Sequence, residues 1–289
     1  MTRSYLYVPG DDEAKLAKAG ARGADALICD LEDSVTPSRK QVARDLVSSA
    51  AGALAATRVE VWVRVNARFL ERDLAAVLQP CLTGIFVPKA EPALLAEAAQ
   101  ILDGDPAWRH VKLIALVETA QGVLDLPAIA RMPRVARLSI GEADLTASLG
   151  IRPSAAEPEL WGIRSQMVIA SAAAGLPGPI GPVHLTVKDL DGLRSSTVEL
   201  QRWGFRARAA IHPGQVAGIN EVFTPSAREV AEALAVASAF ESALASGSGV
   251  HLDADGQMVD LAVVRSAVDT LARAGLTPPA AIDDLVRRA

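Results

Sequence analysis

Charged residues follow short apolar runs at regular intervals along this chain, and their types could support metal and acid–base chemistry. Residues 113–117 run directly into Glu118, and residues 138–141 run into Glu142 and Asp144. The same arrangement recurs at Asp30, Glu32 and Asp33, at Arg64 and Asn66, at Lys89 and at His212. Short apolar runs between helical segments are typical of buried parallel strands. Six such junctions indicate a barrel with a carboxylate-rich mouth at the carboxyl ends of its strands, where (β/α)₈ enzymes keep their chemistry.

Two of these carboxylates, Glu118 and Asp144, are expected on the adjacent strands five and six. Such a pair suits Mg²⁺, with Mn²⁺ as an alternative, because Mg²⁺ takes one or two carboxylates and keeps its waters for substrate oxygens. The residues expected around these two ligands are Asp30, Glu32, Asp33 and Lys89. The competing interpretation is that the acids only cap helices or pair with Arg and Lys. No Cys and His cluster in the sequence argues for zinc.

Two cations are expected to face this site. The planar fork of Arg64, at the end of strand three, matches carboxylate and enolate-like oxygens. The alternative is a salt bridge from Arg64 to Asp30 or Glu32 that only stabilises the mouth, and both roles can hold at once, since metal ligands need surrounding residues that orient them. Lys89 could form a Schiff base, but the surrounding acids would hold it protonated, which disfavours attack. His212, at the end of strand eight, is a candidate for substrate binding, with a purely structural role as the alternative.

Strand and helix signals alternate along residues 1–224 and predict an α/β fold, a (β/α)₈ TIM barrel. The expected strands are residues 5–8, 26–31, 59–65, 84–88, 112–117, 137–140, 179–183 and 208–211. The expected helices are residues 11–21, 37–56, 69–78, 92–102, 122–131, 159–174, 190–203 and 214–222. Eight units in about 220 residues match the usual barrel length. A doubly wound sheet is disfavoured, because no G-x-G-x-x-G follows the first strand.

Residues 225–289 are expected to form a C-terminal helical extension. Helices are predicted over 225–245, 259–274 and 278–289, with a hairpin over 250–258 that turns at Asp255-Gly256. The extension is too short to form a second core alone, so it should pack on its own barrel or on a neighbouring subunit.

Composition excludes several classes of protein. The formal net charge of −5 at pH 7 offers no basic footprint for nucleic acid. No apolar run reaches membrane-spanning length, and the first ten residues lack the apolar core of a signal peptide. The two cysteines, Cys29 and Cys81, lie in or beside apolar segments and are expected to be reduced core thiols. A cytoplasmic protein that binds neither nucleic acid nor membrane is expected.

Eight short motifs stand in order along nearly the whole chain. They are Arg3-Ser4-x-Leu6-Tyr7-Val8-Pro9-Gly10, Asp30-Leu31-Glu32-Asp33-Ser34-Val35, Val63-Arg64-Val65-Asn66, Val87-Pro88-Lys89, Val117-Glu118-Thr119-Ala120, Gly141-x-x-Asp144-Leu145, Ile211-His212-Pro213-x-Gln215 and Gly256-Gln257-Met258-Val259-Asp260. In these motifs the chain resembles the citrate lyase β-subunit-like lyases of the HpcH/HpaI superfamily. The most similar subgroup is that of the stand-alone citramalyl- and malyl-CoA lyases.

The resemblance implies a barrel of the phosphoenolpyruvate/pyruvate type with assigned site residues. Glu118 and Asp144 match the Mg²⁺ ligands. Arg64 matches the arginine that binds the 2-oxo acid oxygens and stabilises the enolate. Asp260 matches a catalytic aspartate that is delivered to the neighbouring subunit's active site in a homotrimer, or in a dimer of trimers. The positions that match contacts to the CoA-bearing substrate are Tyr7, Lys18, Ile211 and His212. A lysine that helps bind CoA in some relatives falls at Ala14, with Lys15 adjacent.

The function implied is a Mg²⁺-dependent carbon–carbon lyase. Its substrates would be a 3-hydroxyacyl-CoA, such as malyl-, citramalyl- or methylmalyl-CoA, on one side and an acyl-CoA thioester with a 2-oxo acid on the other. The alternatives are a citrate lyase β-subunit, a CoA-independent 2-keto-3-deoxy acid aldolase and a non-catalytic assembly or binding subunit. The presence of Arg64, Glu118, Asp144 and Asp260 together counts against the last of these.

Overall fold

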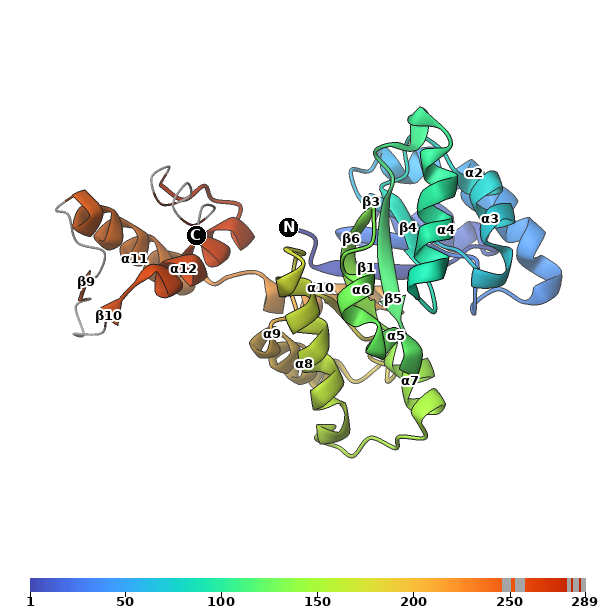
Figure 1. Cartoon of the computed structure of the whole chain (residues 1–289). Helices are drawn as coiled ribbons and strands as arrows, with labels where there is room; N and C mark the ends of the chain where they lie inside the picture. Colours follow the sequence, from blue (N-terminus) through green and yellow to red (C-terminus); the bar gives the residue numbers. More distant parts are fainter. Residues whose placement is uncertain (246–250, 253–257, 280–281, 283–285, 287–289) are drawn as a thin grey trace. The chain divides into compact units, whose positions relative to one another are not determined.

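The computed structural model describes residues 1–245, 251–252, 258–279, 282 and 286, and the chain divides into two compact units. One unit consists of residues 2–221 and the other of residues 222–289 together with Met1. Figure 1 labels most of the helices and strands of both units. None of the helices in the described part of the chain is long and apolar enough to span a membrane.

The larger unit is a closed barrel of eight parallel strands in the order β1 to β8. This confirms the (β/α)₈ prediction. The strands are β1 Ser4–Pro9, β2 Ala26–Asp30, β3 Glu60–Arg64, β4 Gly84–Val87, β5 Lys112–Val117, β6 Val135–Ile140, β7 Ile180–Gly181 and β8 Ala207–Ala210. The barrel closes where β8 pairs with β1. Strand β7 has only two residues, and this explains why its signal in the sequence is weak.

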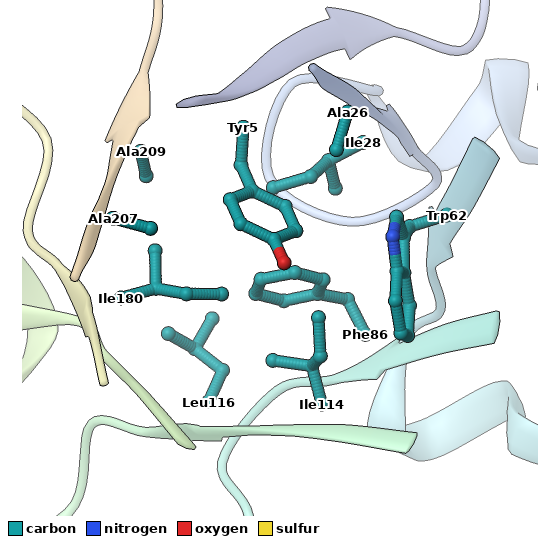
Figure 2. Packing of buried hydrophobic residues seen from close by; sticks show 10 residues of the cluster. All are labelled: Tyr5, Ala26, Ile28, Trp62, Phe86, Ile114, Leu116, Ile180, Ala207 and Ala209. Carbon is teal, nitrogen blue, oxygen red and sulfur yellow. The ribbon is translucent and has the colours of Figure 1, made fainter. Parts of the chain in front are cut away.

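Apolar side chains fill the barrel interior (Figure 2). The cluster contains Tyr5, Ala26, Ile28, Trp62, Phe86, Ile114, Leu116, Ile180, Ala207 and Ala209, all of them buried. Successive side chains of a strand point to opposite faces, so a residue two places after an inward one also points inward. Three such pairs are Ile28 and Asp30, Trp62 and Arg64, and Leu116 and Glu118. The alternation that builds the core therefore aims these three charged residues at the barrel mouth.

The helices surround the barrel. Those of the larger unit are α1 Glu13–Ala19, α2 Lys40–Ala55, α3 Leu70–Val77, α4 Pro92–Asp103, α5 Ala120–Leu124, α6 Leu126–Ile129, α7 Glu142–Leu149, α8 Pro158–Ala173, α9 Leu190–Trp203 and α10 Val216–Phe223, the last of which crosses into the smaller unit. The single helix expected over 122–131 is divided at Asp125, because Pro127 cannot continue the hydrogen-bond ladder of the helix before it.

Helix α7 adds to the sequence prediction, which gave bounds only for the main helix, 159–174, of the helix-bearing segment after strand six. Strand β6 ends at Ile140, and Asp144 lies in the first turn of α7 instead of on the strand. Acidic residues in a first turn are stabilised by the positive end of the helix dipole. Gly150 ends the helix in a left-handed conformation with φ 67°. Glu142, Asp144 and Gly150 together were the available signal for this helix.

The smaller unit is a helical hairpin. Helix α11 Ala227–Ala245 packs against α12 Leu261–Arg273 through Ala233, Ala237, Ala267 and Leu271. The two-residue strands β9 His251–Leu252 and β10 Met258–Val259 pair in antiparallel fashion, as the predicted hairpin requires. The turn at 255–256 and most of the last predicted helix, 278–289, lie outside the described residues.

Candidate active site

Arg64 stands at the centre of a cluster of acids from the end of β2 and the connection that follows it. Its Nε and Nη2 donate to the two carboxylate oxygens of Asp30, at 2.6 and 2.8 Å. Its Nη1 donates to Asp33 at 3.0 Å and lies 3.1 Å from Glu32 Oε2. The guanidinium also stacks on the Tyr7 ring, 4.9 Å from the ring centroid. The salt bridge considered from the sequence therefore exists, and it fixes the orientation of Arg64.

The pKa values of the acids beside Arg64 differ because their partners differ. Burial would raise the pKa of Asp30, but the hydrogen bonds and charge of Arg64 lower it below the usual range. For Glu32, burial outweighs the attraction of Arg64 and Lys89, and the pKa is raised. Glu32 Oε2 is also buried without a partner in hydrogen-bond geometry, although it lies beside Arg64.

The Lys89 ammonium lies among three carboxylates from three different segments. Nζ donates to Glu32 Oε1 at 3.0 Å, and it lies 3.6 Å from Glu118 Oε1 and 3.5 Å from Asp144 Oδ2. These acids outweigh the cost of burial and raise the pKa of Lys89. The lysine is therefore charged near neutral pH, as the sequence predicts. Glu118 and Asp144 face one and the same cation.

The backbone also holds Glu118 in place. The Lys89 backbone N–H donates to Glu118 Oε1 at 2.9 Å, and Lys89 adopts a left-handed φ of 48°. On the other side, a Cβ built on Gly141 would lie 2.5 Å from Glu118 Oε2 and 2.8 Å from Glu118 Cβ. The Glu118 carboxylate thus occupies space that only glycine leaves open at the end of β6.

Gly141→Ala is expected to weaken Mg²⁺ binding about tenfold or more, because metal ligands tolerate only small displacements. The φ of Gly141 is −106°, so the new methyl group acts by contact with Glu118 and not by backbone strain. Gly52→Ala, at an exposed position of helix α2 where a Cβ would meet nothing within 4 Å, is the matched control. Titration of both variants with Mg²⁺ checks the effect, and equal affinities would show that Glu118 has room to adjust.

The donor set of this cluster fits Mg²⁺. Glu118 and Asp144 would supply hard oxygen ligands, and Glu32 has a further buried oxygen that lacks a hydrogen bond. In the described part of the chain, no three His, Cys, Asp or Glu side chains are arranged to hold a metal ion by themselves. A site of two carboxylates completed by water and substrate is the arrangement that Mg²⁺ commonly adopts.

Mg²⁺ affinity is expected to fall with acidification. Burial, and next the charge of Glu32, raise the pKa of Glu118 to about 7. Below that pH the carboxyl is protonated in the metal-free protein, and the proton competes with the metal. The apparent affinity should therefore drop about tenfold between pH 8 and pH 6. Calorimetry in buffers of different ionisation enthalpy should also detect proton release at pH 7. A flat profile over this range would contradict the assignment of Glu118 as a ligand.

Two of the cavities at this end of the barrel are lined by predicted substrate-binding residues. One, of about 410 Å³, is lined by residues that include Arg64, Glu118, Asp144, Leu185 and Ile211. The other, of about 390 Å³, is lined by Leu6, Tyr7, Val8, Pro9, Lys15, Ala19, Arg22, Ile211, His212 and Pro213. Tyr7 and Ile211 line both cavities. Lys15 and Arg22, not singled out from the sequence as binding residues, line the second cavity, whereas Lys18 lines neither.

Polar side chains outside the predicted set position the loops around these cavities. Gln215 is fully buried; its Oε1 accepts from the backbone N–H groups of Ile211 and His212, and its Nε2 donates to the His184 carbonyl. Lys40 Nζ donates to the carbonyls of Leu31 and Glu32. The motif that contains Gln215 was visible in the sequence, but its role depends on contacts between two loops.

Asp260 belongs to the smaller unit. Its Oδ1 accepts from the backbone N–H groups of Ala262 and Val263, so it caps the N-terminus of α12 as an acid at this position should. Its catalytic role stays a prediction.

Comparisons with known proteins agree with this description. Residues 3–213 match the family model of the HpcH/HpaI aldolase/citrate lyase. A (3S)-malyl-CoA thioesterase of Cereibacter sphaeroides is 35% identical over 276 residues, which cover 94% of each chain. The mitochondrial citramalyl-CoA lyase of Rattus norvegicus is 28% identical and covers 92% of this chain and 83% of its own.

A solved relative combines the fold with ligands. The CitE protein of Mycobacterium tuberculosis in complex with magnesium, acetoacetate and coenzyme A has a TM-score of 0.74 and 31% identity, covering 95% of this chain and 98% of its own. The match in fold, the carboxylate-lined mouth and these relatives lead to one conclusion: the chain belongs to the HpcH/HpaI aldolase/citrate lyase family and is a carbon–carbon lyase of the magnesium-dependent kind.

Proposed function

We propose that the enzyme cleaves or forms a 3-hydroxyacyl-CoA, such as malyl-, citramalyl- or methylmalyl-CoA, with an acyl-CoA and a 2-oxo acid on the other side of the reaction. The observation that carries this proposal is the grouping of Arg64, Glu118 and Asp144 around a single cavity at the barrel mouth. A carboxylate pair beside a fixed guanidinium suits a substrate with adjacent hydroxyl or oxo and carboxylate oxygens.

Glu118 and Asp144 would hold Mg²⁺, and Arg64 would bind the oxygens of the 2-oxo acid portion. The bound metal supplies Lewis-acid polarisation of substrate oxygens. In cleavage, the hydroxyl proton passes to solvent water, the bond between the carbinol carbon and the acyl α-carbon breaks, and the carbinol carbon becomes the carbonyl carbon of the 2-oxo acid. The electron pair passes into the thioester enolate, which then takes up a proton at the α-carbon. Arg64 would stabilise the developing negative charge, and Asp260 would deliver that proton, or remove it in the reverse direction.

The CoA portion would lie in the second cavity. Lys15 and Arg22 line it together with His212, and cations of this kind attract the phosphates of CoA. Tyr7 and Ile211 line both cavities, so they would contact the thioester where it passes between them. Lys18, which lies on helix α1 with Lys15, would contribute a further positive charge. The substrate would then extend from its thioester, near the barrel axis, to its CoA portion, near α1.

We further propose that the protein is a homotrimer, or a dimer of trimers, in which residues 225–289 carry Asp260 to the active site of a neighbouring subunit. We also propose that the protein is cytoplasmic. The first alternative is a citrate lyase β-subunit that acts on a citryl thioester, and the second is a CoA-independent 2-keto-3-deoxy acid aldolase.

Thioester hydrolysis is a second candidate function, favoured by the 35% identity to a (3S)-malyl-CoA thioesterase. Hydrolysis would release free CoA and a hydroxy acid without breaking a carbon–carbon bond. The same two cavities would serve, with water attacking the thioester carbonyl.

Condensation assays test the proposal. Acetyl-CoA or propionyl-CoA is mixed with glyoxylate, pyruvate or oxaloacetate, and the 3-hydroxyacyl-CoA product is followed by mass spectrometry with Mg²⁺ and again with EDTA. We expect one pair to react with Mg²⁺ only, and Glu118→Gln to lose the reaction. Absence of product from every pair, with turnover of free 2-keto-3-deoxy acids instead, would favour the CoA-independent aldolase.

A further inference from the structure

We propose that the Lys89 ammonium is a resident counter-ion of the metal site, which neutralises its carboxylates before Mg²⁺ binds, is displaced by the metal and thereby sets the metal affinity. The inference rests on the proposed ligands Glu118 and Asp144. It adds to them a residue that competes with the metal instead of binding it.

The first observation is that Lys89 contacts the same oxygens that the metal needs. Nζ lies 3.6 Å from Glu118 Oε1 and 3.5 Å from Asp144 Oδ2, and a third acid, Glu32, accepts a hydrogen bond from it at 3.0 Å. Mg²⁺ binds oxygens at about 2.0–2.1 Å. A divalent ion between Glu118 and Asp144 would therefore stand close to a like charge, and the two cations would repel each other.

The second observation is that Lys89 can leave. Its side chain is 44% exposed, whereas those of Glu32 and Glu118 are only 6% and 4% exposed. A lysine side chain is a flexible four-carbon stem that carries a strongly hydrated charge. The ammonium can thus move into solvent while the two glutamates stay fixed. The free energy needed to separate the ammonium from the glutamates reduces the net free energy of metal binding.

The third observation separates the role of the Lys89 ammonium from that of the Lys89 backbone N–H. The Lys89 N–H holds Glu118 Oε1 at 2.9 Å, and any residue except proline at position 89 keeps that donor. Lys89→Met therefore removes the charge and retains both the aliphatic stem and the hydrogen bond that positions Glu118. A change in metal affinity on this substitution reports the ammonium alone.

The experiment measures metal binding without substrate, with Mn²⁺ followed by electron paramagnetic resonance and Mg²⁺ by competition. Lys89→Met and Lys89→Gln are expected to lower the Kd for metal about tenfold or more, because the competing charge is gone. Lys89→Arg keeps the charge and should stay within about threefold of the original protein. Lys112→Met, which removes an exposed lysine at the first residue of β5, is the matched control and should leave Kd unchanged.

Thermal unfolding gives a second readout. Without metal, Lys89→Met should lower Tm, because three carboxylates lose their counter-ion, and added Mg²⁺ should then raise Tm by more than it does in the original protein. Unchanged or weaker metal binding in both Lys89→Met and Lys89→Gln would overturn the inference. If instead Glu118→Gln binds metal as well as the original protein does, the ligand assignment itself is wrong and the counter-ion role falls with it.

Discussion

Replacing Arg64 by lysine is expected to lower kcat/KM about a hundredfold or more, with a fall in kcat as well as a rise in KM. The guanidinium is held by two hydrogen bonds to Asp30 and one to Asp33, and it stacks on Tyr7. A lysine ammonium is a point charge and cannot reproduce a planar fork, so charge stabilisation in the transition state is lost together with substrate binding.

The control must show that the loss is not simply misfolding. Arg137 is another arginine buried in the barrel; its guanidinium donates to the carbonyls of Gly178 and Thr2 and to the Tyr5 hydroxyl. Arg137→Lys should cost stability with little effect on kcat. Steady-state kinetics and thermal unfolding of both variants make the comparison. If Arg64→Lys retains near-normal kcat/KM, then Arg64 only braces the acids at the barrel mouth.

The second large effect is expected at Asp260. Asp260→Asn should lower kcat by about 10²- to 10⁴-fold, the usual contribution of a general acid or base. Asparagine is as good an N-cap as aspartate, so the substitution keeps an acceptor for the N–H groups of Ala262 and Val263. The folding of α12 is then preserved, and the loss reports the missing acid.

Mixing subunits tests whether Asp260 acts on a neighbour. Asp260→Asn and Arg64→Ala subunits are each expected to be nearly inactive as homo-oligomers. In a randomly mixed cyclic trimer, about one quarter of the sites would combine an intact Arg64 with an intact Asp260 from the next subunit. Activity should therefore return to about a quarter of the original level. If subunit exchange is verified by native mass spectrometry and no activity returns, Asp260 does not act in trans.

The barrel was predictable because its signals are local. Six of the eight strands are short apolar runs followed by a charged or polar residue, and the inward alternation through Ile28, Trp62 and Leu116 carries Asp30, Arg64 and Glu118 into the mouth. The bounds of helix α7 were not predicted, because Gly141 gives no side-chain cap hydrogen bond and the segment is short. The sequence prediction therefore placed Asp144 on strand six, whereas the structure places it in the first turn of α7.

Contacts between distant segments were less accessible. Nothing near Lys89 in the sequence shows that its ammonium meets Glu32, Glu118 and Asp144, or that its backbone N–H holds Glu118. The hydrogen bonds by which Gln215 links the loop after β7 to the loop after β8 likewise depend on the positions of these two loops in the fold. Periodicity fixes which side of a strand a residue faces, but these contacts also depend on loop lengths and on rotamers set by packing.

Product identity is the most direct test of the central claim, that this site breaks a carbon–carbon bond. Purified protein with Mg²⁺ is incubated with malyl-, citramalyl- and methylmalyl-CoA, and the products are followed by liquid chromatography and mass spectrometry. The account predicts, for at least one of these substrates, an acyl-CoA and a 2-oxo acid in equal amounts, abolished by EDTA and by Glu118→Gln. Release of free CoA and the intact hydroxy acid, with no shorter acyl-CoA at any time, would contradict it.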